Sequence, residues 1–281
     1  GSIWRKPSIH RRGGGLANYN SAVCLSALFS LNRPELLPVI QNLRTYLTKT
    51  QYLTPGKYRG GIGYDLEQER EYADLSNSFM VYDAMRLTEE VEDLRAAGNA
   101  KADLDWEAVQ AFLSQVQNLP SVNTNSWVSD SEEDLGGFVY TPSAGPASVK
   151  DDQVKLRSYG SMTYAGLLSL IYANVDKADE RVQAARNWAT RHWTLDENPG
   201  MGEEGLYYFF NILTKSLAAF GDDMIELPDG RNVVWRQEVI RRLLELQHED
   251  GFWVNENNRW WEANPALVTS YTLLALFHAL Q

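Results

Sequence analysis

The sequence predicts an all-α protein built from helical hairpins in two layers, and three features support this class. Amphipathic helical stretches alternate with stretches that are apolar almost all round. A glycine-containing turn separates the two kinds of stretch, and the same unit recurs along the chain. A helix wetted on one side belongs on an outer surface, whereas a helix apolar all round belongs inside. We therefore expect outer and inner helices to alternate.

The clearest copy of this unit lies between Glu238 and the C-terminus. Its first helix places apolar residues at helical spacing on one side and arginine and glutamate on the other. Its second helix, residues 267–280, carries only serine, threonine and one histidine among apolar residues. A glycine turn and a polar, tryptophan-rich loop connect them. We expect the first helix to be outer and the second to be inner.

Weaker copies of the unit occupy the rest of the chain. The expected inner helices cover residues 16–31, 74–87, 158–171, 206–220 and 267–280, and the outer helices cover 35–49, 105–116, 179–193 and a stretch ending near 247. The turn glycines lie near residues 14, 61, 137, 202 and 251. Pro34 suits a first helical turn, and Asp105 suits an N-cap.

These spacings of roughly 45 to 75 residues fit helical-hairpin repeats with insertions in their loops. We expect one domain over residues 1–281, with hairpin repeats at about 1–31, 32–90, 104–175, 178–221 and 231–281. The chain begins on an inner helix without its outer partner. The sequence therefore predicts an arrangement that is incomplete at the N-terminus.

Composition excludes several classes of function. The chain has 281 residues, of which 44% are hydrophobic, so it can bury a sizeable core. Its net charge of −11 argues against a nucleic-acid-binding protein and, more weakly, against attraction to anionic lipid. No apolar run reaches the length of a membrane span, so a membrane is not indicated. The compartment stays open, with a bacterial-type cytoplasmic or periplasmic protein, or one with a removed signal segment, all compatible.

No metal or cofactor is expected. The single cysteine, Cys24, excludes an internal disulfide and a cysteine-rich metal site, and it suits a buried small side chain. The four histidines show no spacing typical of metal ligands; they are His10, His192, His248 and His278.

The turn formed by Gln247, Gly251 and Trp253, at the end of an amphipathic helix, resembles the QW repeat of the squalene–hopene and oxidosqualene cyclases. Degenerate copies are Gln51 with Gly60-Gly61 and Gln117 with Gly136-Gly137. The hairpins resemble the α/α toroid, a double ring of helices shared by terpenoid cyclases and protein prenyltransferases. This resemblance implies an apolar central cavity with loops at its mouth, an isoprenoid or lipid ligand, and a structural role for the three motif residues.

The resemblance also indicates where cyclase chemistry would lie. Squalene–hopene cyclases protonate an alkene with the middle carboxylic acid of an aspartate-rich motif at the start of an inner helix. Asp74 matches the first aspartate of that motif, but Ser76 stands at the position of the proton donor. Asp74 is therefore the candidate catalytic carboxyl, outside the usual motif. The zinc ligands of protein prenyltransferases have no matching set, because Cys24 stands alone.

Aromatic residues near the starts of the inner helices are candidate ligand contacts. They include Tyr159, Tyr164 and Tyr207, together with Tyr19, Tyr208 and Tyr271. Aromatic faces stabilise cations, although such residues also pack protein cores.

Two polar loops supply the other candidates. Glu203 and Glu204 in the first loop are candidate catalytic carboxylates, and the candidate ligand-binding residues of the second are Asn255, Trp260, Trp261 and Glu262. Carboxylates among aromatic rings suit general acid–base catalysis and also sugar binding. The same residues also suit loops that merely cap hairpins.

Three functions remain open from the sequence. The first is an isoprenoid-related enzyme or a lipid-handling protein that binds an apolar small molecule. The second is a carbohydrate-active enzyme that uses tryptophan platforms and paired carboxylates. The third is a binding domain without catalysis. The lining of the cavity distinguishes them, because an apolar tunnel favours isoprenoid, an acidic groove favours sugar, and a filled centre favours a binding domain.

Overall fold

A computed structural model describes residues 16–66, 71–143 and 155–281 of the chain. Within these ranges the secondary structure is almost entirely helical, which confirms the all-α class. The α-helices are Ala17–Ser30 (α1), Leu37–Thr48 (α2), Leu75–Leu87 (α3), Trp106–Gln115 (α4), Gly160–Tyr172 (α5), Glu180–Arg191 (α6), Leu206–Phe220 (α7), Trp235–Glu245 (α8) and Pro265–Leu280 (α9). The expected turn glycine near residue 14 lies outside the described residues.

Some short elements were not expected. They are the 3-10 turns Pro34–Leu36 (η1), Glu89–Leu94 (η2) and Arg259–Trp261 (η3), and the strands Ile225–Glu226 (β1) and Asn232–Val233 (β2). The two strands pair antiparallel, with Ile225 opposite Val233. Strands this short leave no alternating pattern to detect in the sequence.

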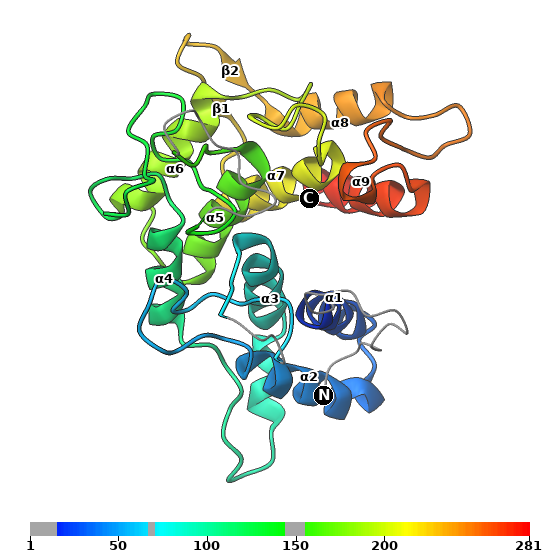
Figure 1. Cartoon of the computed structure of the whole chain (residues 1–281). Coiled ribbons are helices and arrows are strands. Elements are labelled where there is room, and N and C mark those ends of the chain that lie inside the picture. The colour runs from blue at the N-terminus through cyan, green and yellow to red at the C-terminus, as the bar shows by residue number, and fades with distance from the viewer. Residues whose placement is uncertain (1–15, 67–70, 144–154) are drawn as a thin grey trace. The chain divides into compact units, whose positions relative to one another are not determined.

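The chain divides into two compact units, each described here by itself. The first comprises residues 1–116 and 140–145, and the second comprises 117–139 and 146–281. In the first unit α1 packs against α2 and α3 (Figure 1). In the second unit α7 packs between α5 and α9. Helix α6 covers α5, and α8 covers α9. Each unit thus has the layered hairpins of an α/α toroid. The expectation of one domain over the whole chain stays a prediction.

Gln51 ties its own turn to the next outer helix. Its Nε2 donates to the carbonyl oxygens of Gly60 at 3.3 Å and Asp105 at 3.0 Å, and its Oε1 accepts the Asp105 backbone N–H at 2.9 Å. Asp105 is the N-cap of α4, as expected, and its side chain accepts the N–H of Ala108. One buried amide therefore fixes a glycine turn to the start of α4.

The turn that follows Gln117 repeats this arrangement, and the turn that follows Gln247 does not. The Nε2 of Gln117 donates to the carbonyl oxygens of Gly136 at 2.9 Å and Arg181, in α6, at 2.8 Å. The Nε2 of Gln247 reaches only the Gly251 carbonyl oxygen, at 3.0 Å, and this bond is exposed. The glutamine of the resemblance is therefore a structural tie in two copies and closes only its own turn in the third.

The first glycine of each pair permits contact between backbones. A Cβ on Gly60 would lie 1.7 Å from the carbonyl oxygen of Ala108 in α4, and one on Gly136 would lie 2.2 Å from that of Ala184 in α6. Both glycines also have a φ of +93°, which disfavours other residues. These glycines are required by the close approach of the next outer helix.

The second glycine of each pair faces an aromatic ring of that same outer helix. A Cβ on Gly61 would lie 2.7 Å from the Phe112 ring, and one on Gly137 would lie 2.9 Å from Trp188 Nε1. In the third copy Phe252 stands at this position.

Hydroxyl groups near the starts of three inner helices complete the repeat. Each accepts the backbone N–H of the residue that follows the glycine turn. The pairs are Ser78 with Ile62 at 2.9 Å, Thr163 with Phe138 at 3.1 Å and Thr269 with Trp253 at 3.2 Å. These bonds satisfy a backbone donor at each point where the turn meets the inner helix.

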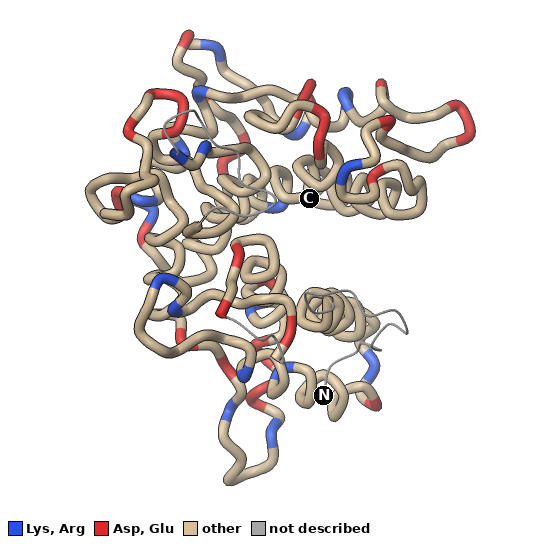
Figure 2. The backbone as a smooth tube through the Cα atoms, in the orientation of Figure 1, with Lys and Arg blue, Asp and Glu red and all other residues tan. Residues whose placement is uncertain are grey.

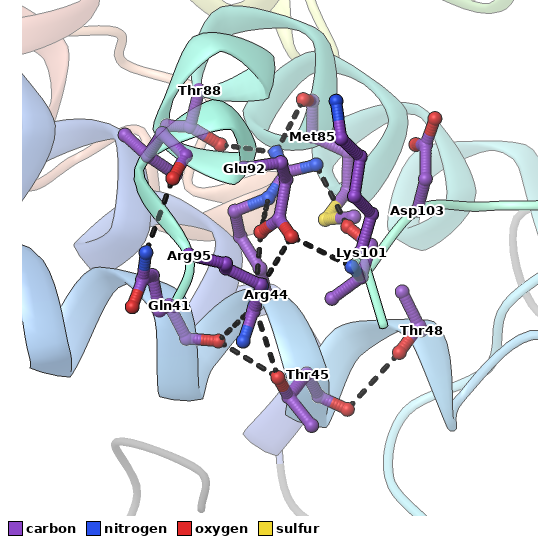
Figure 3. Close-up of polar contacts among 12 residues, drawn as sticks. Gln41, Arg44, Thr45, Thr48, Met85, Thr88, Glu92, Arg95, Lys101 and Asp103 are labelled. Atoms are coloured by element: carbon purple, nitrogen blue, oxygen red, sulfur yellow. Dashed lines mark hydrogen bonds and ion pairs between the residues drawn. The ribbon is translucent and has the colours of Figure 1, made fainter. Parts of the chain in front are cut away.

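A buried ionic network anchors η2 to α2 in the first unit (Figure 3). The guanidinium of Arg44 is fully buried and donates to the Glu92 carboxylate at 2.7 Å. It also donates to the carbonyl oxygens of Met85 and Ala102, and Arg95 forms a second ion pair with Glu92. Burial lowers the pKa of Arg44, opposed by Glu92. Each nitrogen of the buried guanidinium therefore has an acceptor, which indicates that the network stabilises the fold.

No helix in the described part of the chain is both long and apolar enough to cross a membrane.

Candidate functional site

The loop of residues 255–262, called the Trp loop below, is built on a buried carboxylate. Glu262 is fully buried, and it accepts the backbone N–H of Tyr208 at 2.8 Å and that of Tyr207 at 3.3 Å. The first N–H groups of a helix have no acceptor within the helix itself, and a negative charge is favourable at this end of α7. Asn255 closes the loop, because its Nδ2 donates to Glu262 at 2.8 Å and to the Glu203 carbonyl oxygen at 2.8 Å.

This environment shifts two pKa values. Burial raises the pKa of Glu262, against the opposing hydrogen bonds from Asn255 and the N–H groups of Tyr208 and Tyr207. Burial, followed by the nearby charge of Glu262, raises the pKa of the Tyr207 hydroxyl to about 12. Both carboxylate oxygens of Glu262 are occupied within the protein, so its role in the fold is to cap α7.

Trp260 and Trp261 lie on the outside of this loop in an unusual backbone conformation. Their φ angles are +58° and +64°, in the left-handed region that bulky residues avoid. The side chains are 45% and 63% exposed. Strain of this kind persists only where the surrounding structure enforces it, and here the Asn255–Glu262 clamp does so. Two large rings are thus held at the surface at an energetic cost.

Charged groups surround Trp260. The guanidinium of Arg259 lies 4.6 Å from the ring centroid of Trp260 and 3.7 Å from the Glu204 carboxylate. Trp260 also lies against Gly205, at the start of α7. Glu203 is exposed. The structure therefore places the Glu204 carboxylate beside the Trp loop and joins Glu203 to the loop through its backbone carbonyl oxygen.

Asp74, the third predicted catalytic residue, belongs to the first unit and is the N-cap of α3. Its two carboxylate oxygens accept the backbone N–H and the side-chain amide of Asn77, both at 2.8 Å. Burial raises its pKa to about 6, although hydrogen bonds from Asn77 and Tyr140 oppose the shift. Asp74 is thus a fully buried acid that can change protonation near neutral pH.

A group of tyrosines lies beside Asp74, and we call it the tyrosine cluster. The rings of Tyr64 and Tyr72 stack with centroids 5.6 Å apart, and the hydroxyl oxygens of Tyr64 and Tyr140 are 3.1 Å apart. Burial raises the pKa of all three hydroxyls, and the charge of Asp74 raises them further. The cluster provides neutral phenols that hydrogen-bond close to a buried carboxyl.

Tyr159 and Tyr164 contribute to the α5 region of the second unit. Tyr159 is the N-cap of α5 and packs near Gly200. Tyr164 packs on Phe209 and lines a cavity of about 30 Å³ together with Arg186 and other residues of α5, α6 and α7. That volume holds about one water molecule, so this cavity does not fit an isoprenoid chain.

The surface of α9 contradicts the expectation that an apolar helix is buried all round. Its buried stripe consists of small residues, namely Val268, Thr272, Ala275 and Ala279. Its large apolar residues are exposed instead: Leu273, Leu274, Phe277 and Leu280 are each close to or above half exposed. We call these four residues the apolar face of α9. Small residues allow α9 to pack tightly in its unit, while the large ones stay exposed.

A comparison with solved structures finds a likeness to Candida albicans protein geranylgeranyltransferase-I complexed with GGPP. The sequences are 16% identical, and the match covers 91% of this chain but only 66% of that one, with a TM-score of 0.49. No family model and no curated protein matches the chain.

The structure gathers most of the predicted loop and tyrosine residues at one end of α7. Glu203, Glu204 and Tyr207 lie with the Trp loop; Asp74 belongs to the other unit. Tyr159 and Tyr164 lie on α5. Cys24, expected to be buried, is only partly so.

Sequence reasoning missed several residues that shape these sites. The tyrosine cluster was overlooked because Tyr140 is far from Tyr64 and Tyr72 in sequence. The exposed side of α9 was missed because hydropathy alone does not say which apolar residues are covered. The small residues at helical spacing were the available signal, since they mark the side where another backbone approaches.

Proposed function

We propose that this protein binds an apolar, isoprenoid-like molecule on the apolar face of α9. The observation that supports the proposal is the exposure of four large apolar side chains on a helix of the inner layer. Soluble proteins seldom display contiguous apolar patches without a binding role. Covering such side chains contributes about 1.5–3 kcal/mol each, enough for several to retain a ligand of moderate affinity.

The ligand class follows from the kind of surface. The face is a stripe of branched and aromatic side chains along one helix, with Tyr271 and Tyr208 in edge contact nearby. A long, methyl-branched chain matches such a stripe better than a compact ligand does. The resemblance of Gln247, Gly251 and Trp253 to the cyclase repeat favours isoprenoids among apolar chains. In this proposal the α9 face takes the part of the cavity wall that the resemblance implies.

Native mass spectrometry with geranylgeraniol and with a linear glucan oligosaccharide tests the proposal. We expect retention of the prenyl alcohol and none of the glucan. The double variant Leu273→Ser/Phe277→Ser should weaken retention at least about tenfold, because two apolar contacts are lost.

Leu94→Ser is the matched control, since Leu94 is an equally exposed leucine in η2 of the first unit. We expect this variant to bind like the original protein. Equal loss in both variants, or no retention of the prenyl alcohol, would remove the proposal. Retention of the glucan instead would favour the carbohydrate alternative.

Acid catalysis at Asp74 is a second candidate function. The observation that favours it is a fully buried carboxyl with a pKa of about 6 beside the hydroxyls of Tyr140 and Tyr64. Protonation of an alkene or epoxide needs an acid that is neutral when the substrate arrives and is shielded from water. If an isoprenoid is turned over, Asp74→Asn should abolish turnover, and unchanged rates would exclude Asp74. Glu203 and Glu204 stay candidates only for the carbohydrate alternative.

A further inference from the structure

We propose that the Trp loop is a docking surface for a basic segment of a partner protein, one that carries arginine or lysine side chains. The surface consists of the exposed rings of Trp260 and Trp261 and of the acidic side chains beside them. This proposal is independent of the apolar face of α9.

The first argument is that the loop is fixed before any partner binds. Glu262 is buried under it and anchored to two backbone N–H groups of α7, and Asn255 joins it to the Glu203 carbonyl oxygen. The Asn255 backbone N–H also donates to the Glu262 carbonyl oxygen at 3.0 Å, which closes the loop at its base. A surface held in this way loses little conformational entropy when it binds.

The second argument is the strain in the two tryptophans. Folding places two consecutive bulky residues at positive φ and leaves the larger part of Trp261 in solvent. Neither the positive φ nor the solvent exposure of these tryptophans stabilises the folded protein. Glycine would adopt this backbone conformation at lower cost, and a polar side chain would be more favourable in solvent. Such features concentrate at functional sites. Tryptophan is also the residue most enriched among the energetically dominant residues of protein interfaces.

The third argument is charge. Glu203 and Glu256 are exposed, and Glu204 is partly exposed, whereas Arg259 is the single basic residue of the Trp loop. The chain as a whole carries a net charge of −11, with Asp and Glu on many of its loops (Figure 2). An acidic surface steers basic partners toward it and repels acidic ones.

The fourth argument is a contact within the chain that illustrates the chemistry. Arg259 places its guanidinium over the Trp260 ring while pairing with the Glu204 carboxylate. A ring and a carboxylate together therefore hold a guanidinium at this surface already. Trp261 offers a second, more exposed ring, and Glu256 and Glu203 offer further carboxylates for a cation supplied by a partner.

Calorimetric titration of the full chain with an arginine–glycine repeat peptide, and with a glutamate–glycine repeat peptide as its matched control, tests the proposal. We expect binding of the basic peptide only, with affinity falling as salt is raised. Trp261→Gly should weaken binding about tenfold, from loss of a cation–π contact. Its unfolding temperature should stay the same or rise, because glycine accepts a φ of +64°. Glu256→Gln should weaken binding severalfold and reduce the salt dependence.

Phe277→Ser serves as a second control, because it removes an exposed aromatic ring from α9 and leaves the Trp loop intact. We expect it to bind the basic peptide normally. Equal binding of both peptides, or unchanged affinity in folded Trp261→Gly, would overturn the proposal. Binding of a linear oligosaccharide that depends on Trp261 but not on Glu256 would overturn it in favour of a sugar platform.

Discussion

Two buried charges in the first unit are stabilised in different ways. Arg44 is paired with Glu92 and satisfied by carbonyl oxygens on its remaining sides. Asp74 receives hydrogen bonds from Asn77, yet no basic side chain is paired with it among the described residues. Burial therefore dominates at Asp74 and raises its pKa, whereas Arg44 keeps its charge. The two residues predict opposite responses to substitution.

Asp74→Asn should stabilise the protein near pH 8 and flatten its pH dependence. The folded-state pKa of about 6 lies above the reference value of 3.8, so Asp74 contributes its full stability only below pH 3.8 and loses it as pH rises through 6. That shift corresponds to about 3 kcal/mol. Asparagine remains a good N-cap, and the Oδ1 of Asn77, which has no hydrogen-bond partner among the described residues, can accept from the new amide.

Urea unfolding of both proteins from pH 4 to 8 measures this effect. We expect the original protein to lose stability relative to the asparagine variant as pH rises. A difference that stays constant across this range would show that Asp74 does not titrate in the folded state.

Arg44→Ala should be strongly destabilising, by about 3–5 kcal/mol. The substitution leaves the Met85 and Ala102 carbonyl oxygens and part of the Glu92 carboxylate buried without their donor. Arg33→Ala is the control, since the Arg33–Glu35 pair is exposed on both sides and should contribute little to stability. Chemical denaturation of the two variants gives the comparison, and similar losses would contradict the structural role of Arg44.

At the scale of elements, the glycine turn determines how an outer helix joins the previous hairpin. Gly60 packs against Ala108, and Gln51 bonds to Asp105, three residues before that alanine. In the next copy Gly136 packs against Ala184, and Gln117 bonds to Arg181, again three residues before the alanine. Phe112 and Trp188 follow each alanine after one further turn and meet the second glycine. The glutamine, the glycine pair and the helix surface therefore work as a single joint.

Gly60→Ala should cost more than about 4 kcal/mol or prevent folding, because its Cβ would overlap the Ala108 backbone at 1.7 Å. Gly98→Ala is a matched control. Gly98 has a similar φ of +89°, but a Cβ there meets nothing within 4 Å. We expect that control to cost only the backbone strain, about 1–2 kcal/mol. Thermal unfolding distinguishes the two, and equal shifts would mean that strain, not the close approach of α4, requires the glycine.

At the scale of the whole molecule, the first unit is discontinuous in sequence. Its main part ends at residue 116, but residues 140–145 return to it. The returning segment bonds beside the N-cap of α3, since Leu75 N–H donates to the Tyr140 carbonyl oxygen at 2.7 Å and Thr141 Oγ1 donates to that of Ala73 at 2.9 Å. Tyr140 also meets Tyr64. The short segment that begins at residue 140 thus completes the unit.

A fragment of residues 1–116 should therefore be less stable than the same residues in the full chain. It lacks these three hydrogen bonds, which together contribute about 3 kcal/mol. Hydrogen exchange at the Leu75 amide is the direct measurement, and we expect its protection to be lost in the fragment. Full protection of that amide in the fragment would show that the segment beginning at residue 140 is not needed for the stability of the first unit.

The sequence determined much of the local structure because helix periodicity, caps and turn glycines are local properties. The bounds of α7 and the cap at Asp105 were predicted correctly. The strands at 225–233 were missed because strands of two residues carry no periodicity. The sequence also did not reveal that Glu262 and Asp74 cap helices, because a carboxylate that caps a helix and one that binds a substrate look alike in sequence.

The sequence by itself therefore determined the all-α class, the alternation of helices and the turn motif, since each follows from residues close together in the chain. Only the tertiary structure decided which side of α9 is covered, which carboxyls are satisfied, and which glycines meet a backbone. These depend on contacts between segments far apart in sequence. Burial also sets the pKa of Asp74, and burial is a property of the packed fold that no single stretch of sequence contains.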